Sequence, residues 1–151
     1  MPDQPLKPQQ LAEACVDAIQ ANDNAVRLLG IEVIEVQPGN ATVCMTITEE
    51  MTNSHNNCHG GLIFTLADAG FAFACNNANQ MTVASGCSIE FIAPATIGDR
   101  LTAVVRERSR SRRTGVYDAE ITNQRKELVA LFRGKSYQIR GQIIPQTGIQ
   151  T

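Results

Sequence analysis

The sequence predicts an α+β fold in which an antiparallel β-sheet wraps around one long buried helix. Residues 62–75 carry apolar side chains on nearly every side of a helix, and segments with the alternation of β-strands lie before and after them. A sheet closed around such a helix hides both apolar surfaces. With 151 residues, 43% apolar and 19% charged, the chain has the size and apolar content of a single folded domain.

The elements follow in order from these patterns. Apolar residues recur at helical spacing from Leu11 to Ile19, so an amphipathic helix is predicted to begin near Pro8. The chain is expected to divide into a flexible Pro-rich tail over 1–10, one domain over 11–140 and a polar tail over 141–151, of which 142–151 frays.

Six strands are predicted from β-branched runs separated by turn residues. They cover 31–36, 41–47, 82–92, 100–109, 115–123 and 128–139. The first contains a slip in its alternation, and Pro38-Gly39-Asn40 predicts a hairpin turn after it. The last four are expected to form a meander.

Composition excludes several classes of protein. Thirteen Lys and Arg against 15 Asp and Glu give a net charge of −2, which argues against nucleic-acid binding through bulk positive potential. No apolar run reaches the ~18 residues that span a bilayer, and the first ten residues contain no apolar signal core. Five cysteines without Cys-x-x-Cys spacing indicate a reducing compartment. A cytoplasmic protein that binds neither membranes nor nucleic acid is expected.

Asp68 is the first candidate for chemistry. It is the only ionisable side chain between His59 and the end of the predicted buried helix. Burying a lone carboxylate is costly unless it is hydrogen-bonded, shifts its pKa or faces a cleft. Because this helix offers almost no polar face, we expect Asp68 to line a pocket as a base or nucleophile.

The loop before this helix is the second candidate. Residues 53–61 are polar and end in Gly60-Gly61, directly before the helix. The first N–H groups of a helix have no intrahelical partner and lie at its positive dipole end. Glycines there let a ligand approach the backbone, so the Gly60 N–H is a candidate oxyanion donor. Zinc binding by His55, Cys58 and His59 and a Cys58/His59 nucleophile pair fit less well, because no fourth ligand cluster and no third orienting group exist.

Gly60 and Asp68 are eight positions apart, which is about 12 Å along a helix at ~1.5 Å per residue. A single carbonyl cannot contact both. If the two act together, Gly60 of one subunit must face Asp68 of another, as two antiparallel helices around a two-fold axis allow. A dimer is therefore expected.

A row of arginines is the third candidate. Arg106, Arg108, Arg110 and Arg112 alternate along a predicted strand, which places all four on one face, and Arg113 follows. Guanidinium groups suit phosphates, although a solvated charged face is the alternative. Candidates for phosphate binding are Arg110, Arg112, Arg113 and Lys135.

The string from His59 to Asp68, HGGLIFTLAD, with Asn53 before it and 85–94 after it, resembles the hot-dog-fold acyl-CoA thioesterases, in particular their phenylacetate-pathway (PaaI-type) branch. The resemblance extends over about 28–139 and includes 113–118 and 131–135. Asn56 departs from the glycine that many members have in this loop; Asn tolerates left-handed φ angles, so little damage is expected.

The resemblance implies a hot-dog fold, dimers that pair further into tetramers, and no metal or bound cofactor. By it Asp68 is the catalytic carboxylate and Gly60 the thioester-polarising N–H, with Gly61 beside the substrate. It also implies that His59 and Asn53 position the loop and the carbonyl and that Ser85 helps to orient the attacking water.

An acyl-CoA thioesterase is therefore predicted, acting on an aryl acyl-CoA of the phenylacetyl or hydroxyphenylacetyl type or on a medium-chain acyl-CoA. Whether Asp68 activates water or attacks directly stays open. Two alternatives also stay open: a hot-dog hydratase or dehydratase that uses His59 for proton transfer, and a non-catalytic acyl-CoA-binding module.

Overall fold

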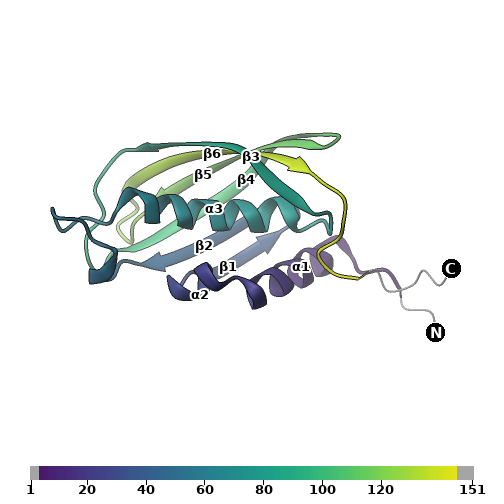
Figure 1. Ribbon diagram of the computed structural model, residues 1–151, viewed down its shortest axis with the longest axis horizontal. Helices are drawn as coiled ribbons and strands as arrows, with labels where there is room; N and C mark the ends of the chain where they lie inside the picture. The colour runs from purple at the N-terminus through teal and green to yellow at the C-terminus, as the bar shows by residue number, and fades with distance from the viewer. Residues whose placement is uncertain (1–3, 146–151) are drawn as a thin grey trace.

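A computed structural model describes residues 4–145 of the chain (Figure 1). Two helices come first, α1 (Pro8–Asn22) and α2 (Asn24–Leu28), and one long helix, α3 (Gly60–Asn76), lies in the middle of the chain. A 3-10 turn, η1 (Glu49–Met51), precedes α3. The strands are β1 (Glu32–Gln37), β2 (Asn40–Thr46), β3 (Thr82–Phe91), β4 (Arg100–Ser111), β5 (Thr114–Thr122) and β6 (Leu128–Gln138).

The six strands form one antiparallel sheet in the order β1-β2-β4-β5-β6-β3, and α3 lies across one face of it. Figure 1 shows α3 running along the sheet, with α1 and α2 beside β1. The large buried side chains Phe71, Phe73 and Leu66 fill the space between α3 and the sheet. The predicted α+β fold, a sheet around one long helix, is confirmed.

One part of the predicted topology is wrong. The last four strands do not form a simple meander, because β3 pairs with β6 instead of β4. The chain leaves α3, forms the far edge of the sheet as β3, and returns across it to place β4 beside β2. Local patterns identify a strand but carry no information on which distant strand it pairs with, and β3 becomes an edge strand as a result.

Local features near the N-terminal half match their sequence signals. The slip in the first strand is a bulge between Val33 and Glu35, and Gly39 turns the β1–β2 hairpin with a φ of 78°. Helix α2 was not predicted. Its signal is Asp23, whose side chain accepts a hydrogen bond of 3.0 Å from the Val26 N–H as an N-cap does.

The sequence pattern predicts that helix α3 is buried on every side, and this prediction is wrong. Ten of its 17 residues are buried, and four of the seven that are partly or fully exposed lie on one face. These are Gly61, Thr65, Asp68 and Ala72. Their spacing of three or four residues places them in one stripe along the helix, away from the sheet. In the single chain, Asp68 therefore lies at a surface.

The strand β3 is exposed along nearly its whole length. Among residues 4–145 its only neighbouring strand is β6, so one edge of β3 carries backbone groups without a strand partner there. At its ends Val83 is 43% and Phe91 54% exposed, and Ile92 just beyond is 53% exposed. A long apolar edge strand of this kind is a template for pairing with another chain.

Helix α1 begins at Pro8, so its first turn lies inside the segment predicted as a tail. At the other end, Asn79 accepts hydrogen bonds from the Ile143 and Ile144 N–H groups at 3.0 and 2.8 Å, so this part of the chain is fixed and does not fray as predicted. The predicted fraying of 146–151 falls outside the described residues. No helix within 4–145 is long and apolar enough to cross a membrane.

Candidate active site

Helix α3 begins at Gly60, with His59 as its N-cap, and presents unpaired backbone donors there. The preceding chain is fastened on both sides: the His59 N–H donates to the Met51 carbonyl at 2.8 Å and the Cys58 N–H to the Ala95 carbonyl at 2.7 Å. Within residues 4–145 the Gly60 and Gly61 N–H groups have no hydrogen-bond acceptor. The helix dipole adds positive potential at this point, so the arrangement suits an anionic or polarised oxygen.

Asn53 organises the loop that leads to Gly60. Its Oδ1 accepts hydrogen bonds from the His55 and Asn57 N–H groups at 2.9 and 3.3 Å. Its own N–H donates to the Asn57 carbonyl at 2.8 Å. Asn56 adopts a φ of 60°, the left-handed conformation that the sequence had suggested it tolerates. The side chain of His59 is exposed and makes no capping hydrogen bond.

An apolar groove of about 400 Å³ opens beside Gly60. The ring of Phe91 lies against Gly60, since a Cβ on Gly60 would be only 2.9 Å from the Phe91 Cζ atom. No charged side chain lines this groove within the described part of the chain. Its lining consists of Asn57, Cys58, Gly60, Ile63, Phe91, Ile92, Ala93, Pro94 and Ala95. The wall formed by residues 91–95 was not predicted from the sequence, because only the path of the chain after β3 brings these residues to Gly60.

Asp68 lies two helical turns further along α3. Its carboxylate is partly buried, and no donor or cation within 4–145 bonds to it. Burial is the main cause that raises the pKa of Asp68 above its usual value, and the negative charge of Asp23 adds to it. A poorly solvated carboxylate without a partner is a candidate proton acceptor or nucleophile. No local pattern in the sequence indicates that Asp23 lies close enough to act on the Asp68 carboxylate.

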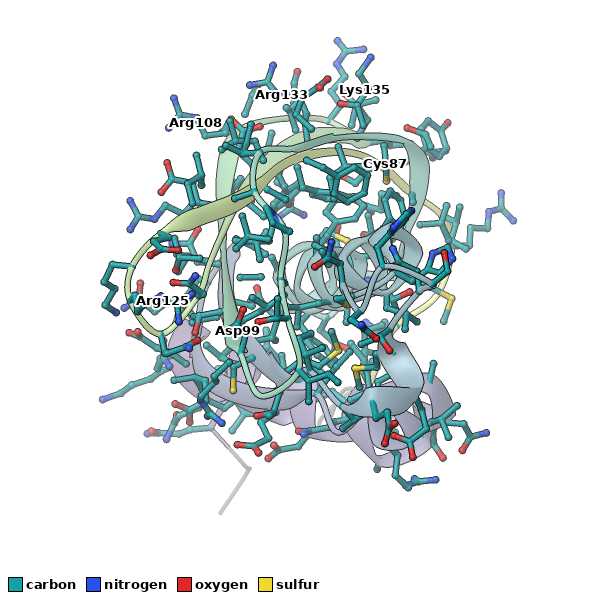
Figure 2. All side chains as sticks on the ribbon, turned by 90° about the vertical axis from the view of Figure 1, so that its left-hand side faces the viewer. Cys87, Asp99, Arg108, Arg125, Arg133 and Lys135 are labelled. Atoms are coloured by element: carbon teal, nitrogen blue, oxygen red, sulfur yellow. The ribbon has the colours of Figure 1, made fainter. Side chains whose placement is uncertain are left out.

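Ser85 and Cys87 lie on β3. Ser85 occupies a bulge between Ala84 and Gly86, and its hydroxyl donates to the Lys135 carbonyl at 3.2 Å. Cys87 is exposed. Partial burial of its thiol is the main cause that raises the pKa of Cys87, and the negative charge of Asp68 raises it further. Figure 2 shows Cys87 on the side of the sheet that faces α3. The β3 edge and Asp68 therefore border the same surface.

The four arginines do not lie on one face, and that prediction is wrong. A bulge between Glu107 and Ser109 adds a residue to β4, so the alternation changes side there. Arg106 pairs opposite Asp118 on the face away from α3, whereas Arg110 pairs opposite the buried Gly115 on the α3 side.

The other predicted phosphate ligands lie in the turn after β4 and on β6. Arg112, with a φ of 53°, and Arg113 form the turn between β4 and β5. Lys135 projects from the outer face of β6, as Figure 2 shows together with Arg108 and Arg133. The predicted phosphate ligands are therefore divided between the α3 side of the sheet, where Arg110 lies, the β4–β5 turn and the outer face of the sheet, where Lys135 lies.

Comparison with known proteins places this geometry in a family. A family model described as the thioesterase superfamily matches residues 55–130, which include Gly60 and Asp68. The chain is 49% identical to the acyl-coenzyme A thioesterase PaaI of Escherichia coli K12 over 126 residues. The matched region covers 83% of this chain and 90% of that protein.

Solved structures agree with the sequence relatives. The E. coli PaaI protein from the phenylacetic acid degradation operon superposes with a TM-score of 0.89 at 46% identity, over 90% of this chain and 99% of that one. A Streptococcus mutans protein bound to acetyl CoA superposes with a TM-score of 0.71 at 26% identity, over 74% and 90% of the two chains.

Proposed function

This chain belongs to the thioesterase superfamily and is a thioester hydrolase, and on that premise we propose that it hydrolyses aryl or medium-chain acyl-CoA esters with Asp68 as its catalytic carboxylate. The observation that carries the proposal is that, among residues 4–145, helix α3 holds both an N–H without an acceptor at Gly60 and a partly buried carboxylate without a donor at Asp68. Acyl-CoA as the substrate class is supported by the acyl-coenzyme A thioesterase relative and by the acetyl CoA in the S. mutans structure.

Gly60 supplies the electrophilic half of the reaction. A thioester carbonyl oxygen that accepts a hydrogen bond from the Gly60 N–H develops negative charge as the carbonyl carbon is attacked, and the dipole of α3 stabilises that charge. The acyl group then extends into the apolar groove beside Gly60, which offers no charged side chain to a coenzyme phosphate. The exposed ring of Phe91 gives this groove an aromatic wall.

Asp68 supplies the nucleophilic half by one of two routes. As a base it takes a proton from a water molecule while the water oxygen attacks the carbonyl carbon; the tetrahedral intermediate then expels the coenzyme thiolate, which is protonated. As a nucleophile its carboxylate oxygen attacks, expels the thiolate and forms a mixed anhydride that water hydrolyses. Both routes require an ionised Asp68. Asn53 orders the loop, and in this proposal His59 helps to position the carbonyl and Ser85 helps to orient the attacking water.

One active site draws on two subunits in this proposal. Gly60 and Asp68 are about 12 Å apart along α3 at ~1.5 Å per residue, so one thioester cannot contact both within a chain. The exposed edge of β3 and the stripe of α3 that carries Asp68 form the surface on which a second copy would pair. Pairing of such dimers into tetramers, and a cytoplasmic location, stay predictions.

The test is an assay for free coenzyme thiol over a panel of CoA esters, with phenylacetyl-, hydroxyphenylacetyl-, hexanoyl- and decanoyl-CoA as substrates. Release of one thiol and one carboxylic acid per ester, fastest for the aryl or medium-chain members, supports the proposal. A change in the acyl chain by addition or loss of water without thiol release would support the hydratase alternative. Binding of the esters without any turnover would support a binding module and contradict the proposed mechanism.

A further inference from the structure

Asp99, just before β4, holds two turns of the chain together. Its carboxylate, 6% exposed, accepts hydrogen bonds from the Thr96 N–H at 2.9 Å and the Thr96 hydroxyl at 3.3 Å. From the β5–β6 turn, Gln124 Nε2 donates to it at 2.9 Å and Arg125 Nη1 lies 3.6 Å from it. Figure 2 shows Asp99 and Arg125 at the end of the molecule where the β3–β4 loop passes. We call these four residues the Asp99 clamp.

The clamp holds the segment against which the Gly60 loop rests. Thr96 forms a bridge with Asn57, and the Ala95 carbonyl accepts the Cys58 N–H at 2.7 Å. Gly60 follows Cys58 by two residues, and Ala95 also lines the groove beside Gly60. A continuous set of hydrogen bonds thus runs from the β5–β6 turn through Asp99 and Thr96 to the start of α3.

Only an anionic acceptor at position 99 satisfies these donors as they stand. The Oε1 atom of Gln124 accepts the Arg100 N–H at 3.0 Å, so its amide cannot rotate to offer an oxygen to residue 99 without losing that bond. Thr96 presents a backbone N–H, which can only donate a hydrogen bond and therefore needs an acceptor at residue 99. The hydrogen bond from the Thr96 N–H is the main cause that lowers the pKa of Asp99, so the carboxylate is ionised at neutral pH.

From this geometry we propose that Asp99 is a positioning residue for the oxyanion donor: through Thr96 and the 57–58 segment it fixes where the Gly60 N–H points. The proposal rests on the proposed function, in which Gly60 polarises the thioester. Hydrogen bonds to a developing oxyanion depend steeply on position, and a displacement near 1 Å costs on the order of 10²-fold in rate. Releasing the clamp shifts the donor while Asp68, on the body of α3, stays in place.

The test compares Asp99→Asn with Asp118→Asn by steady-state kinetics on the CoA ester that the native enzyme cleaves fastest. Asp118 is a matched control, because its carboxylate also bonds to an arginine, Arg133, at 2.6 and 2.9 Å but lies on the outer face of β5. Measured where thermal melts show each variant fully folded, Asp99→Asn should lower kcat about ten-fold with KM changed less than about two-fold. Asp118→Asn should leave both unchanged.

A second substitution tests the geometry by rescue. In the double variant Asp99→Asn with Gln124→Glu, the new amide oxygen at 99 accepts the Thr96 N–H and its NH₂ donates to the new carboxylate at 124. That carboxylate also accepts the Arg100 N–H, so the hydrogen bonds that join residue 99 to Thr96 and to residue 124 are both restored. The double variant should recover most of the lost kcat.

Each outcome decides the proposal. Unchanged kcat in folded Asp99→Asn, an equal loss in Asp118→Asn, a rise in KM alone, or no recovery in the double variant would overturn it. If Asp99→Asn does not fold, Gln124→Ala removes one bond of the clamp from an exposed position and should lower kcat about three-fold; no change in kcat would then refute the idea. An active Asp68→Asn enzyme would instead refute the proposed function, so the two failures are distinguishable.

Discussion

Asp68 and Asp99 are both shielded from solvent, but their surroundings shift the pKa values of the two carboxylates in opposite directions. Asp68 faces no donor within 4–145 and has a raised pKa, chiefly because of burial. Asp99 accepts three hydrogen bonds and lies beside Arg125, and its pKa is lowered. A satisfied carboxylate holds structure in place, whereas an unsatisfied one keeps its lone pairs for a reaction. The difference therefore separates the candidate catalytic group from a group that supports the fold around it.

The sharpest way to break this comparison is to neutralise Asp68. Asp68→Asn should fold normally and lose about 10² to 10⁴ in kcat, because the amide is nearly isosteric and is neither base nor nucleophile. Thiol release from acyl-CoA and circular dichroism of the same preparation measure the two properties. Turnover close to that of the native enzyme in a well-folded Asp68→Asn protein would rule out the proposed mechanism.

Removing the Gly60 donor should cost about 10² to 10³ in kcat. Gly60→Pro deletes the N–H, and proline is well tolerated at the first position of a helix. Gly60→Ala is the matched control, because it adds a similar Cβ against Phe91 but keeps the N–H. Gly60→Ala should remain much more active than Gly60→Pro; equal losses would show that the contact with Phe91, and not the N–H, is responsible.

Mixing the two lesions tests whether a site is shared between subunits. When Asp68→Asn and Gly60→Pro chains are co-expressed, a mixed dimer should contain one site with both lesions and one with neither. Random pairing makes half of the dimers mixed, so about a quarter of native activity per site should return. Activity that stays at the level of the separate variants in a verified mixed dimer would place both groups within one subunit.

The two carboxylates should also differ in stability. In Asp99→Asn one oxygen becomes an NH₂ group, so either Thr96 or Gln124 loses its acceptor, which costs about 1 to 3 kcal/mol in the free energy of unfolding. Asp68→Asn removes an unpaired charge and should leave the free energy of unfolding the same or higher. Urea unfolding followed by circular dichroism measures both. A larger loss in the free energy of unfolding in Asp68→Asn than in Asp99→Asn would contradict the view that Asp99 supports the fold and Asp68 does not.

Acidification should separate the two regions by pH. Because the pKa of Asp68 is raised, kcat should fall first as the pH drops through that value and the base is protonated. Because the pKa of Asp99 is lowered, its contribution to stability is present above the pKa of an unfolded aspartate and is lost only at lower pH. A folded but inactive window is expected. Asp23→Asn, which keeps the N-cap of α2, should move the kcat limb to lower pH, since it removes a negative charge near Asp68.

The smallest expected effect concerns coenzyme binding around the Asp68 surface. Neutralising Arg110 and Arg112 together should raise KM for acyl-CoA about 3- to 10-fold at low salt and leave kcat nearly unchanged, because phosphate contacts bind ground and transition states alike. Lys135→Gln is the informative comparison, since Lys135 lies on the opposite face of the sheet from Arg110. A KM that rises only in Lys135→Gln would move the phosphate site to the outer face.

The sequence by itself determined the long apolar helix and the approximate bounds of all six strands. It also identified the Gly60 N–H and the Asp68 carboxylate on α3 as candidate groups. Their signals are local: a helical or strand period, a Gly-Gly pair before a helix, and one acid in an apolar run. The separation of Gly60 and Asp68 also follows from local geometry, because a helix has a fixed rise per residue. These features depend on neighbours in the sequence, so they can be predicted without knowing how the rest of the chain folds.

Only the tertiary structure decided what depends on distant partners. It placed β3 at the far edge of the sheet, which exposed the surface beside Asp68, and it placed the bulge in β4 that sends Arg106 and Arg110 to opposite faces. It also brought Asp99, Thr96 and the Gly60 loop into one set of hydrogen bonds. Strand pairing, register and side-chain bonds between loops are chosen by the free energy of the whole packed domain, and no local pattern in this chain encodes them.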